Sequence, residues 1–168
     1  MRVGTGFDVH AFADDRSRPL VLAGVEIPGA PGLAGHSDAD VVAHAFADAL
    51  LGAAALGDLG SQFGVDDPGL AGTSSLELLA RVATQVAAVG WRISNLDCVV
   101  VAQRPPLATF RDEMRVRVAT RLGLPHGDVS VKITSTDRLG AVGRAEGIAC
   151  LATCCIVRSG SDGAPPPV

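Results

Sequence analysis

The sequence predicts an α+β fold, a single domain with helices packed on one face of a mixed β-sheet. Its 168 residues can bury enough apolar surface for one self-sufficient core. Segments with an apolar period of two alternate with segments of helical periodicity in the order β, β, α, α, β, α, β, β. No internal repeat and no break in composition divides the chain, so residues 1–158 are expected to form the domain.

The first elements are two extended segments and a helix. Residues 1–10 predict a strand. Residues 19–29 carry apolar side chains near period two between prolines and glycines, which predicts a short strand or hairpin. Ser37 is the predicted N-cap of a helix over residues 38–56, whose first turn holds acidic side chains that the helix dipole favours.

A second helix is predicted to begin at a capping box, after a loop. Residues 56–74 are rich in glycine and acidic residues and are predicted to form a functional loop. Ser74-x-x-Glu77 then predicts a capping box, and Gly90 ends the helix. The apolar side chains that recur at helical spacing in this segment are Leu79, Val82, Val86 and Val89.

The second half of the chain adds three strands and one helix. Residues 93–103 predict a buried strand, and residues 128–134 and 148–158 predict two more. Pro105-Pro106 introduces a third helix, since proline is favoured in a first turn. Its apolar face is formed by Leu107, Phe110, Met114, Val118 and Leu122. Residues 159–168 have no hydrophobic period and are expected to be a disordered tail.

Composition excludes several classes of partner. The formal net charge of −4 and the lack of a basic run argue against nucleic acid. No signal-peptide pattern and no uncharged apolar stretch of about 18 residues is present, so we expect a cytoplasmic protein without a membrane contact. The cysteines fit no metal or redox spacing and are expected to be buried thiols, at Cys98, Cys150, Cys154 and Cys155.

Three potential metal ligands occur in the first 44 residues. Asp8 and His10 lie two apart on a predicted strand and therefore project from one face. His44 lies on the first predicted helix, with Asp40 and Asp48 four residues before and after it. Asp8, His10 and His44 have the ligand count of a catalytic zinc site with one open position. Asp48 or Asp40 is expected to accept a hydrogen bond from the imidazole nitrogen of His44 that does not bind the metal.

Longer motifs resemble a known family. The stretches GFDVHAF at 6–12, GHSDADVVAHAFADALLGAAALGDLG at 35–60 and GRAEGIAC at 143–150 resemble the 2-C-methyl-D-erythritol 2,4-cyclodiphosphate synthase family. The similarity runs from about residue 1 to residue 158. It implies the layered architecture of chorismate mutase-like and ferredoxin-like folds, and a homotrimer whose active sites lie between subunits.

The resemblance also implies a reaction in isoprenoid precursor biosynthesis. The 2-phosphate of 4-diphosphocytidyl-2-C-methyl-D-erythritol 2-phosphate would attack the β-phosphorus, releasing CMP and leaving 2-C-methyl-D-erythritol 2,4-cyclodiphosphate. Such an enzyme is a phosphorus–oxygen lyase. The resemblance implies Zn²⁺ on Asp8, His10 and His44, and Mg²⁺ or Mn²⁺ at Asp137, bridging the diphosphate.

Individual site residues follow from the same resemblance. It implies catalytic roles for His36 and Ser135. The implied substrate contacts are Asp8, His10, His36, Ser37, Asp58, Gly60, Phe63, Asp67, Ala102, Pro105, Leu107, Thr134, Ser135, Thr136, Asp137 and Arg144. The chain departs from the family's usual pattern at four positions: Asp137 replaces a glutamate, Pro106 a lysine, Val65 an aspartate and Ala141 an aromatic residue.

Two other functions are consistent with the metal ligands. A zinc phosphohydrolase would use the same His₂-carboxylate set to activate water. A trimeric scaffold that binds a small ligand would use the histidines structurally. The products formed and the presence of metal distinguish these alternatives.

Overall fold

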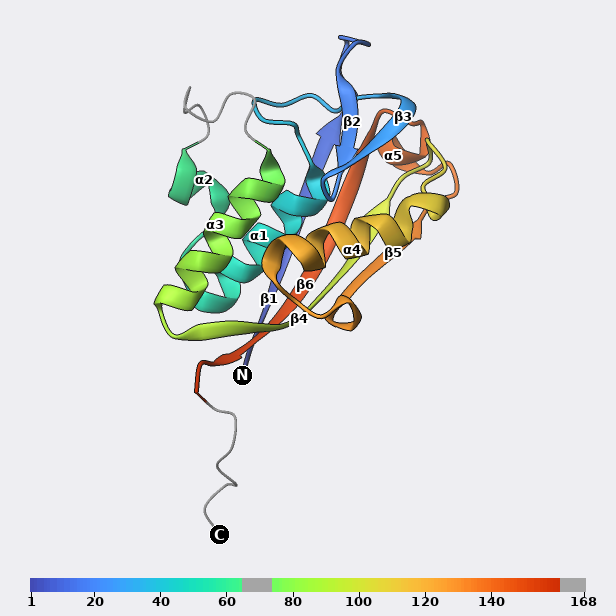
Figure 1. Ribbon diagram of the computed structural model, residues 1–168. Coiled ribbons are helices and arrows are strands. Elements are labelled where there is room, and N and C mark those ends of the chain that lie inside the picture. The colour runs from blue at the N-terminus through green and yellow to red at the C-terminus, as the bar shows by residue number, and fades with distance from the viewer. Residues whose placement is uncertain (65–73, 161–168) are drawn as a thin grey trace.

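A four-stranded mixed sheet forms the centre of the molecule. The computed structural model describes residues 1–64 and 74–160. The sheet order is β1-β6-β4-β5, in which β6 is antiparallel to both neighbours and β4 is parallel to β5 (Figure 1). The strands are β1 (Arg2–Ala11), β4 (Trp91–Val101), β5 (Val129–Thr134) and β6 (Gly147–Arg158). The predicted mixed sheet is confirmed.

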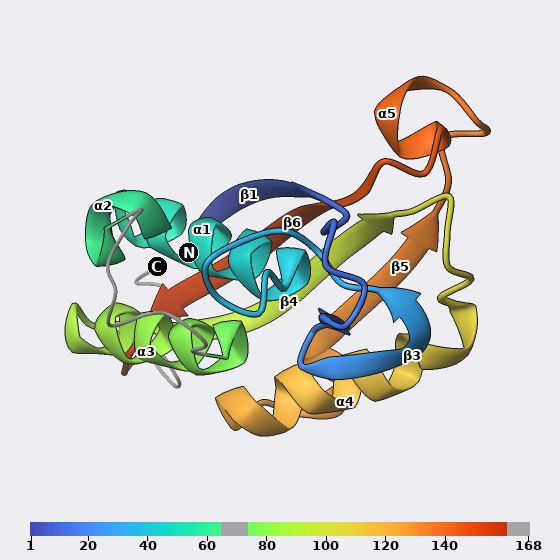
Figure 2. The same ribbon diagram turned by 90° about the horizontal axis from the view of Figure 1, so that it is seen from above.

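Three long helices cover one face of this sheet, as predicted (Figures 1 and 2). They are α1 (Val41–Ala54), α3 (Ser75–Ala88) and α4 (Arg111–Leu122). The segment at 19–29 is a hairpin, formed by β2 (Pro19–Leu22) and β3 (Val25–Pro31). The shorter elements are α2 (Leu59–Phe63), α5 (Gly140–Gly143), η2 (Ala108–Phe110) and η3 (His126–Asp128).

Helix α1 lies directly on strand β1 because the strand presents glycines to it. A Cβ atom on Gly4 would lie 2.0 Å from the carbonyl oxygen of Ala49, and one on Gly6 would lie 2.1 Å from that of Ala45. Any side chain at either position would therefore push the helix away. This close approach brings His44 on α1 to the Asp8 side of β1.

The start of α1 differs from the sequence prediction. The N-cap is Asp40 and not Ser37, and its carboxylate accepts hydrogen bonds from the amides of Val42 and Ala43. The same carboxylate accepts the amides of Ala23 and Gly24 in the β2–β3 turn, at 2.8 and 2.7 Å. Burial raises the pKa of Asp40 to about 6. Asp40 therefore ties the hairpin to the helix and does not face the metal ligands.

Four other predictions about the ends of helices and the loops need correction. Ser74 is the N-cap of α3, but its side chain makes no capping bond, so the predicted capping box is absent. Val89 lies beyond the helix and is 43% exposed. The predicted loop at 56–74 contains α2, and the third helix begins after η2 and not at Pro105-Pro106. The remainder of that loop and most of the predicted tail, residues 65–73 and 161–168, lie outside the described residues.

The core lies between the helices and the sheet. The thiols of Cys98, Cys150 and Cys154 are buried and that of Cys155 is partly buried, as expected for structural cysteines. Burial raises the pKa of Cys154 to about 11, so its thiol is unreactive. Within residues 1–64 and 74–160, no helix is long and apolar enough to span a bilayer.

The opposite face of the sheet carries exposed apolar side chains. Val3, Phe7 and Val9 on β1 are 61%, 60% and 53% exposed, and Leu151 on the neighbouring β6 is 45% exposed. Phe7 and Leu151 are paired across the two strands. We call these four residues the outer apolar patch. Among the described residues, the long helices α1, α3 and α4 all lie on the other face of the sheet (Figures 1 and 2).

Candidate metal centre

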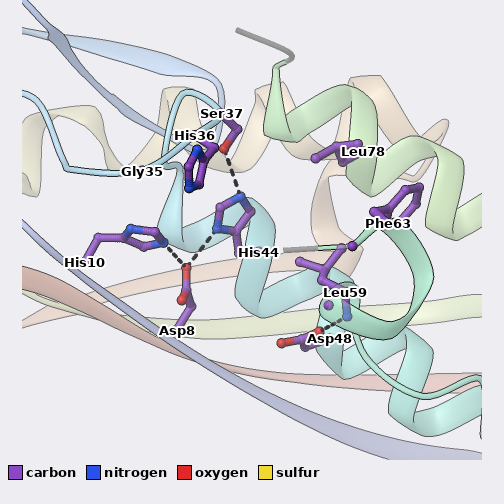
Figure 3. Close-up of a pocket in the computed structure, with 12 residues that line it drawn as sticks. Asp8, His10, Gly35, His36, Ser37, His44, Asp48, Leu59, Phe63 and Leu78 are labelled. Atoms are coloured by element: carbon purple, nitrogen blue, oxygen red, sulfur yellow. Dashed lines mark hydrogen bonds and ion pairs between the residues drawn. The ribbon is translucent and has the colours of Figure 1, made fainter. Parts of the chain in front are cut away.

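Asp8, His10 and His44 meet at one point, as the sequence predicts. Asp8 Oδ2 lies 3.1 Å from His10 Nε2 and 2.9 Å from His44 Nδ1 (Figure 3). One ligand atom from each residue lies within 4.8 Å of the others. Ligands at zinc bond lengths in a tetrahedral arrangement are roughly 3.3 Å apart. The donor types and their spacing therefore fit a divalent metal such as zinc.

The charge distribution of the three residues also suits a cation. Burial raises the pKa of Asp8, but hydrogen bonds from His10 and His44 outweigh it and hold this pKa well below its usual range. The hydrogen bond to Asp8 raises the pKa of His10. The site thus holds a permanent carboxylate charge between two imidazoles.

The outer nitrogens of both imidazoles have hydrogen-bond partners. His10 Nδ1 lies 2.5 Å from the carbonyl oxygen of Ala34, and His44 Nε2 lies 2.8 Å from Ser75 Oγ. Asp48 lines the pocket but accepts the amide of Leu59 at 2.8 Å (Figure 3). The partner predicted for His44 was therefore wrong, since Ser75 makes the contact expected of Asp48 or Asp40.

A pocket of about 280 Å³ opens beside the three ligands. Besides the three ligands and Asp48, four of its lining residues are predicted site residues: His36, Ser37, Gly60 and Phe63. Its apolar wall is formed by Leu59, Phe63 and Leu78 (Figure 3). Sequence reasoning identified Phe63 but missed the two leucines. Nothing in the helical pattern of α3 distinguishes Leu78 from an ordinary core residue.

Several of the other predicted site residues lie in a second region, where β4 and β5 end. Ala102 follows β4 and donates its amide to the carbonyl of Thr134, at the end of β5. Ser135 donates to the Asp137 carboxylate at 3.2 Å, while Thr136 donates to the carbonyl of Leu139. The segments at the ends of β4 and β5, residues 102–107 and 134–137, therefore start side by side at Ala102 and Thr134. We call them the β4–β5 cluster.

Two predicted residues of the β4–β5 cluster have surroundings of their own. Pro105 lines a separate pocket of about 380 Å³, together with Arg104 and Pro106. Leu107 is 2% exposed, so its side chain belongs to the core and only its backbone is available to a ligand.

Within one chain the structure does not bring all predicted residues together. Strands β1 and β5 form opposite edges of the sheet, three strand spacings or about 14 Å apart. Arg144 is exposed and pairs with Glu146 at 2.6 Å. Asp58 caps α2 through the amide of Ser61, and Asp67 lies outside the described residues. The metal ligands and the β4–β5 cluster are thus separate sites in a single chain.

Comparison with known proteins gives consistent matches over most of the chain. The model of the YgbB family matches residues 1–157. The 2-C-methyl-D-erythritol 2,4-cyclodiphosphate synthase of Thermosynechococcus vestitus is 51% identical over 90% of this chain and 93% of its own length. That of Yersinia enterocolitica is 47% identical over 94% of this chain and 98% of its own length.

Solved structures agree with these sequence matches. The bifunctional IspDF of Campylobacter jejuni superposes with a TM-score of 0.89 and 41% identity, over 94% of this chain and 42% of that one. A CDP complex of Plasmodium falciparum IspF gives a TM-score of 0.82 and 28% identity, over 94% of this chain and 96% of that one. The chain therefore belongs to the YgbB family, the family of the 2-C-methyl-D-erythritol 2,4-cyclodiphosphate synthases.

Proposed function

We propose that this enzyme converts 4-diphosphocytidyl-2-C-methyl-D-erythritol 2-phosphate to 2-C-methyl-D-erythritol 2,4-cyclodiphosphate and CMP, as a cytoplasmic step of isoprenoid precursor biosynthesis. The observation that carries the proposal is the convergence of Asp8, His10 and His44 beside a pocket, in a chain 51% identical to a named synthase. We assign Zn²⁺ to these three ligands. A bound zinc ion supplies Lewis-acid polarisation of a phosphoryl oxygen.

The protein residues around the ligands position the reacting groups. His36 and Ser37 line the pocket beside the three ligands, where they can donate to phosphate oxygens (Figure 3). The wall of Leu59, Phe63 and Leu78 is apolar, so these side chains offer no hydrogen bond to ordered water near the phosphates. Since the substrate carries its own nucleophile, the enzyme needs only to fold it and to neutralise charge.

The β4–β5 cluster is the proposed site for the cytidine half of the substrate. Asp137 is proposed to hold Mg²⁺ or Mn²⁺ on the diphosphate, and Ser135, which donates to it, is proposed as the second catalytic group. The backbone of residues 102–107 is proposed to contact the base, with Thr134 and Thr136 beside it. A relative from Plasmodium falciparum has been solved as a CDP complex.

A single substrate must contact both clusters, which in one chain lie toward opposite edges of the sheet. We therefore propose a homotrimer in which the metal ligands of one subunit face the β4–β5 cluster of the next. The outer apolar patch supports this assembly, because Val3, Phe7, Val9 and Leu151 would otherwise stay in water. Arg144 is proposed to face phosphate near the trimer axis.

Charge in the outer apolar patch is expected to dissociate the assembly. Phe7→Asp would place a carboxylate at the centre of a buried contact, so we expect monomers in multi-angle light scattering and loss of most turnover. Val89→Asp is the matched control, because Val89 is also apolar and 43% exposed but lies at the end of α3. A Phe7→Asp protein that remained trimeric and active would contradict this arrangement.

Product analysis tests the reaction itself. Metal-loaded protein incubated with the cytidylated substrate is expected to release CMP and to give the cyclic diphosphate in phosphorus NMR. A linear phosphate containing oxygen from labelled water would instead indicate a phosphohydrolase. If metal-replete protein released no CMP, the proposed function would be wrong.

Zinc affinity is expected to fall as the pH is lowered, because His10 becomes protonated. The raised pKa of His10 means that a proton competes for this ligand at a higher pH than for an ordinary histidine. Below that pKa we expect the apparent Kd to rise about tenfold per pH unit. Competition with a chromophoric chelator from about pH 8 to about pH 5.5 measures it, after correction for the chelator's own protonation. A flat profile would contradict the prediction.

A further inference from the structure

We propose that Ser75 and Asp38 are positioning residues for the metal centre, acting through His44. The inference rests on the proposed zinc site and concerns residues outside its three ligands. Ser75 is the first residue of α3 and is 1% exposed. Its hydroxyl oxygen lies 2.8 Å from His44 Nε2 and in hydrogen-bond contact with Asp38 Oδ1.

The direction of each hydrogen bond follows from counting donors. A carboxylate only accepts, so the single hydroxyl proton of Ser75 is donated to Asp38. The oxygen of Ser75 is then an acceptor toward His44, and Nε2 of His44 must carry the proton that it receives. Nδ1 is then the nitrogen that would bind a metal, which would take the place of the proton now lying between Nδ1 and Asp8 Oδ2, 2.9 Å away.

The hydrogen bonds from His44 through Ser75 to Asp38, which we call the relay, also fix the orientation of the imidazole. His44 is held at Nε2 by a buried group, so its ring has little freedom to rotate away from Asp8 and His10. The Ser37 hydroxyl is a further neighbour, 3.2 Å from Ser75 Oγ and 3.4 Å from His44 Nε2. Since a hydrogen bond from a carboxylate-backed partner raises the basicity of a ligating histidine, the relay should strengthen zinc binding.

Asp38 has a second role that the test must separate from the first. Both of its carboxylate oxygens accept the backbone amide of Ser75 at 3.1 Å, which supplies the capping bond that the Ser74 side chain does not make. Ser75→Ala removes only the hydroxyl and leaves these backbone bonds in place. The start of α3 should therefore stay folded in this variant.

Zinc affinity of the full-length protein is the principal measurement, by competition with a chromophoric chelator. We expect Ser75→Ala to raise the Kd for zinc roughly 10-fold to 100-fold, the usual effect of removing the hydrogen-bond partner of a ligating histidine. Asp38→Asn keeps an acceptor for the hydroxyl but loses its charge, so its effect should be smaller. Ser74→Ala is the matched control and should bind zinc like the wild type, because its hydroxyl makes no capping bond.

A second readout excludes a merely structural effect. In the zinc-loaded wild type, the His44 Nε2 proton should be protected from exchange and visible in a ¹H–¹⁵N correlation of the imidazoles, whereas Ser75→Ala should lose it. If Ser75→Ala bound zinc within twofold of the wild type and kept this signal, the inference would be wrong. If the wild type itself bound no zinc, the proposed metal centre would fail instead.

Discussion

His44→Ala is expected to remove bound zinc and to lower kcat at least about 1,000-fold. The substitution leaves Asp8 and His10 as two ligands, below the three protein ligands that catalytic zinc sites use. Loss of the Lewis acid removes several kcal/mol of charge stabilisation, and about 4 kcal/mol corresponds to a factor near 1,000. Metal content by mass spectrometry and CMP release measure the two effects on the same sample.

His126→Ala supplies the matched control for this experiment. His126 is the fourth histidine of the chain, lies in η3 and is exposed, away from the three ligands. It should keep full zinc occupancy and turnover. Retention of stoichiometric zinc and normal turnover by His44→Ala would rule out the assigned ligand set.

The order of elements was predictable because each depends on local periodicity. The alternation in 19–29 and the helical spacing of Leu79, Val82 and Val86 are properties of short segments, and the structure confirms both elements. The start of α1 was not predictable in this way. Asp40 is the N-cap because the β2–β3 turn supplies two further amides to its carboxylate, and that turn lies 16 residues or more away in sequence.

The metal ligands were predictable for a chemical reason. The hydrogen-bond partner that holds His44 was not predictable. Asp8, His10 and His44 are donor types at spacings that a strand and a helix convert into a shared face. The partner of His44 depends instead on how the start of α3 packs against α1. Ser75 is separated from His44 by 31 residues. Asp48, on the expected helix face, is engaged by the amide of Leu59.

Gly6→Ala is expected to damage both the fold and the metal site. An alanine Cβ would lie 2.1 Å from the carbonyl oxygen of Ala45, where ordinary contacts are 3.4 Å or more, so α1 must move by more than 1 Å. Overpacking against helix backbone should cost about 2–4 kcal/mol in the free energy of unfolding, measured with urea on metal-free protein. Because His44 precedes Ala45, it moves with the helix, and zinc affinity should fall as well.

Gly52→Ala separates this steric effect from the general effect of adding a methyl group. Gly52 lies in α1 itself, and a Cβ there meets no atom within 4 Å. Alanine in a helix is favoured over glycine by about 0.5–1 kcal/mol, so this variant should be slightly more stable than the wild type, with unchanged zinc affinity. Equal unfolding free energies for Gly6→Ala and Gly52→Ala would mean that contact between β1 and α1 does not position His44. A large difference, accompanied by weaker zinc binding only in Gly6→Ala, is the result that the packing of Gly6 against Ala45 requires.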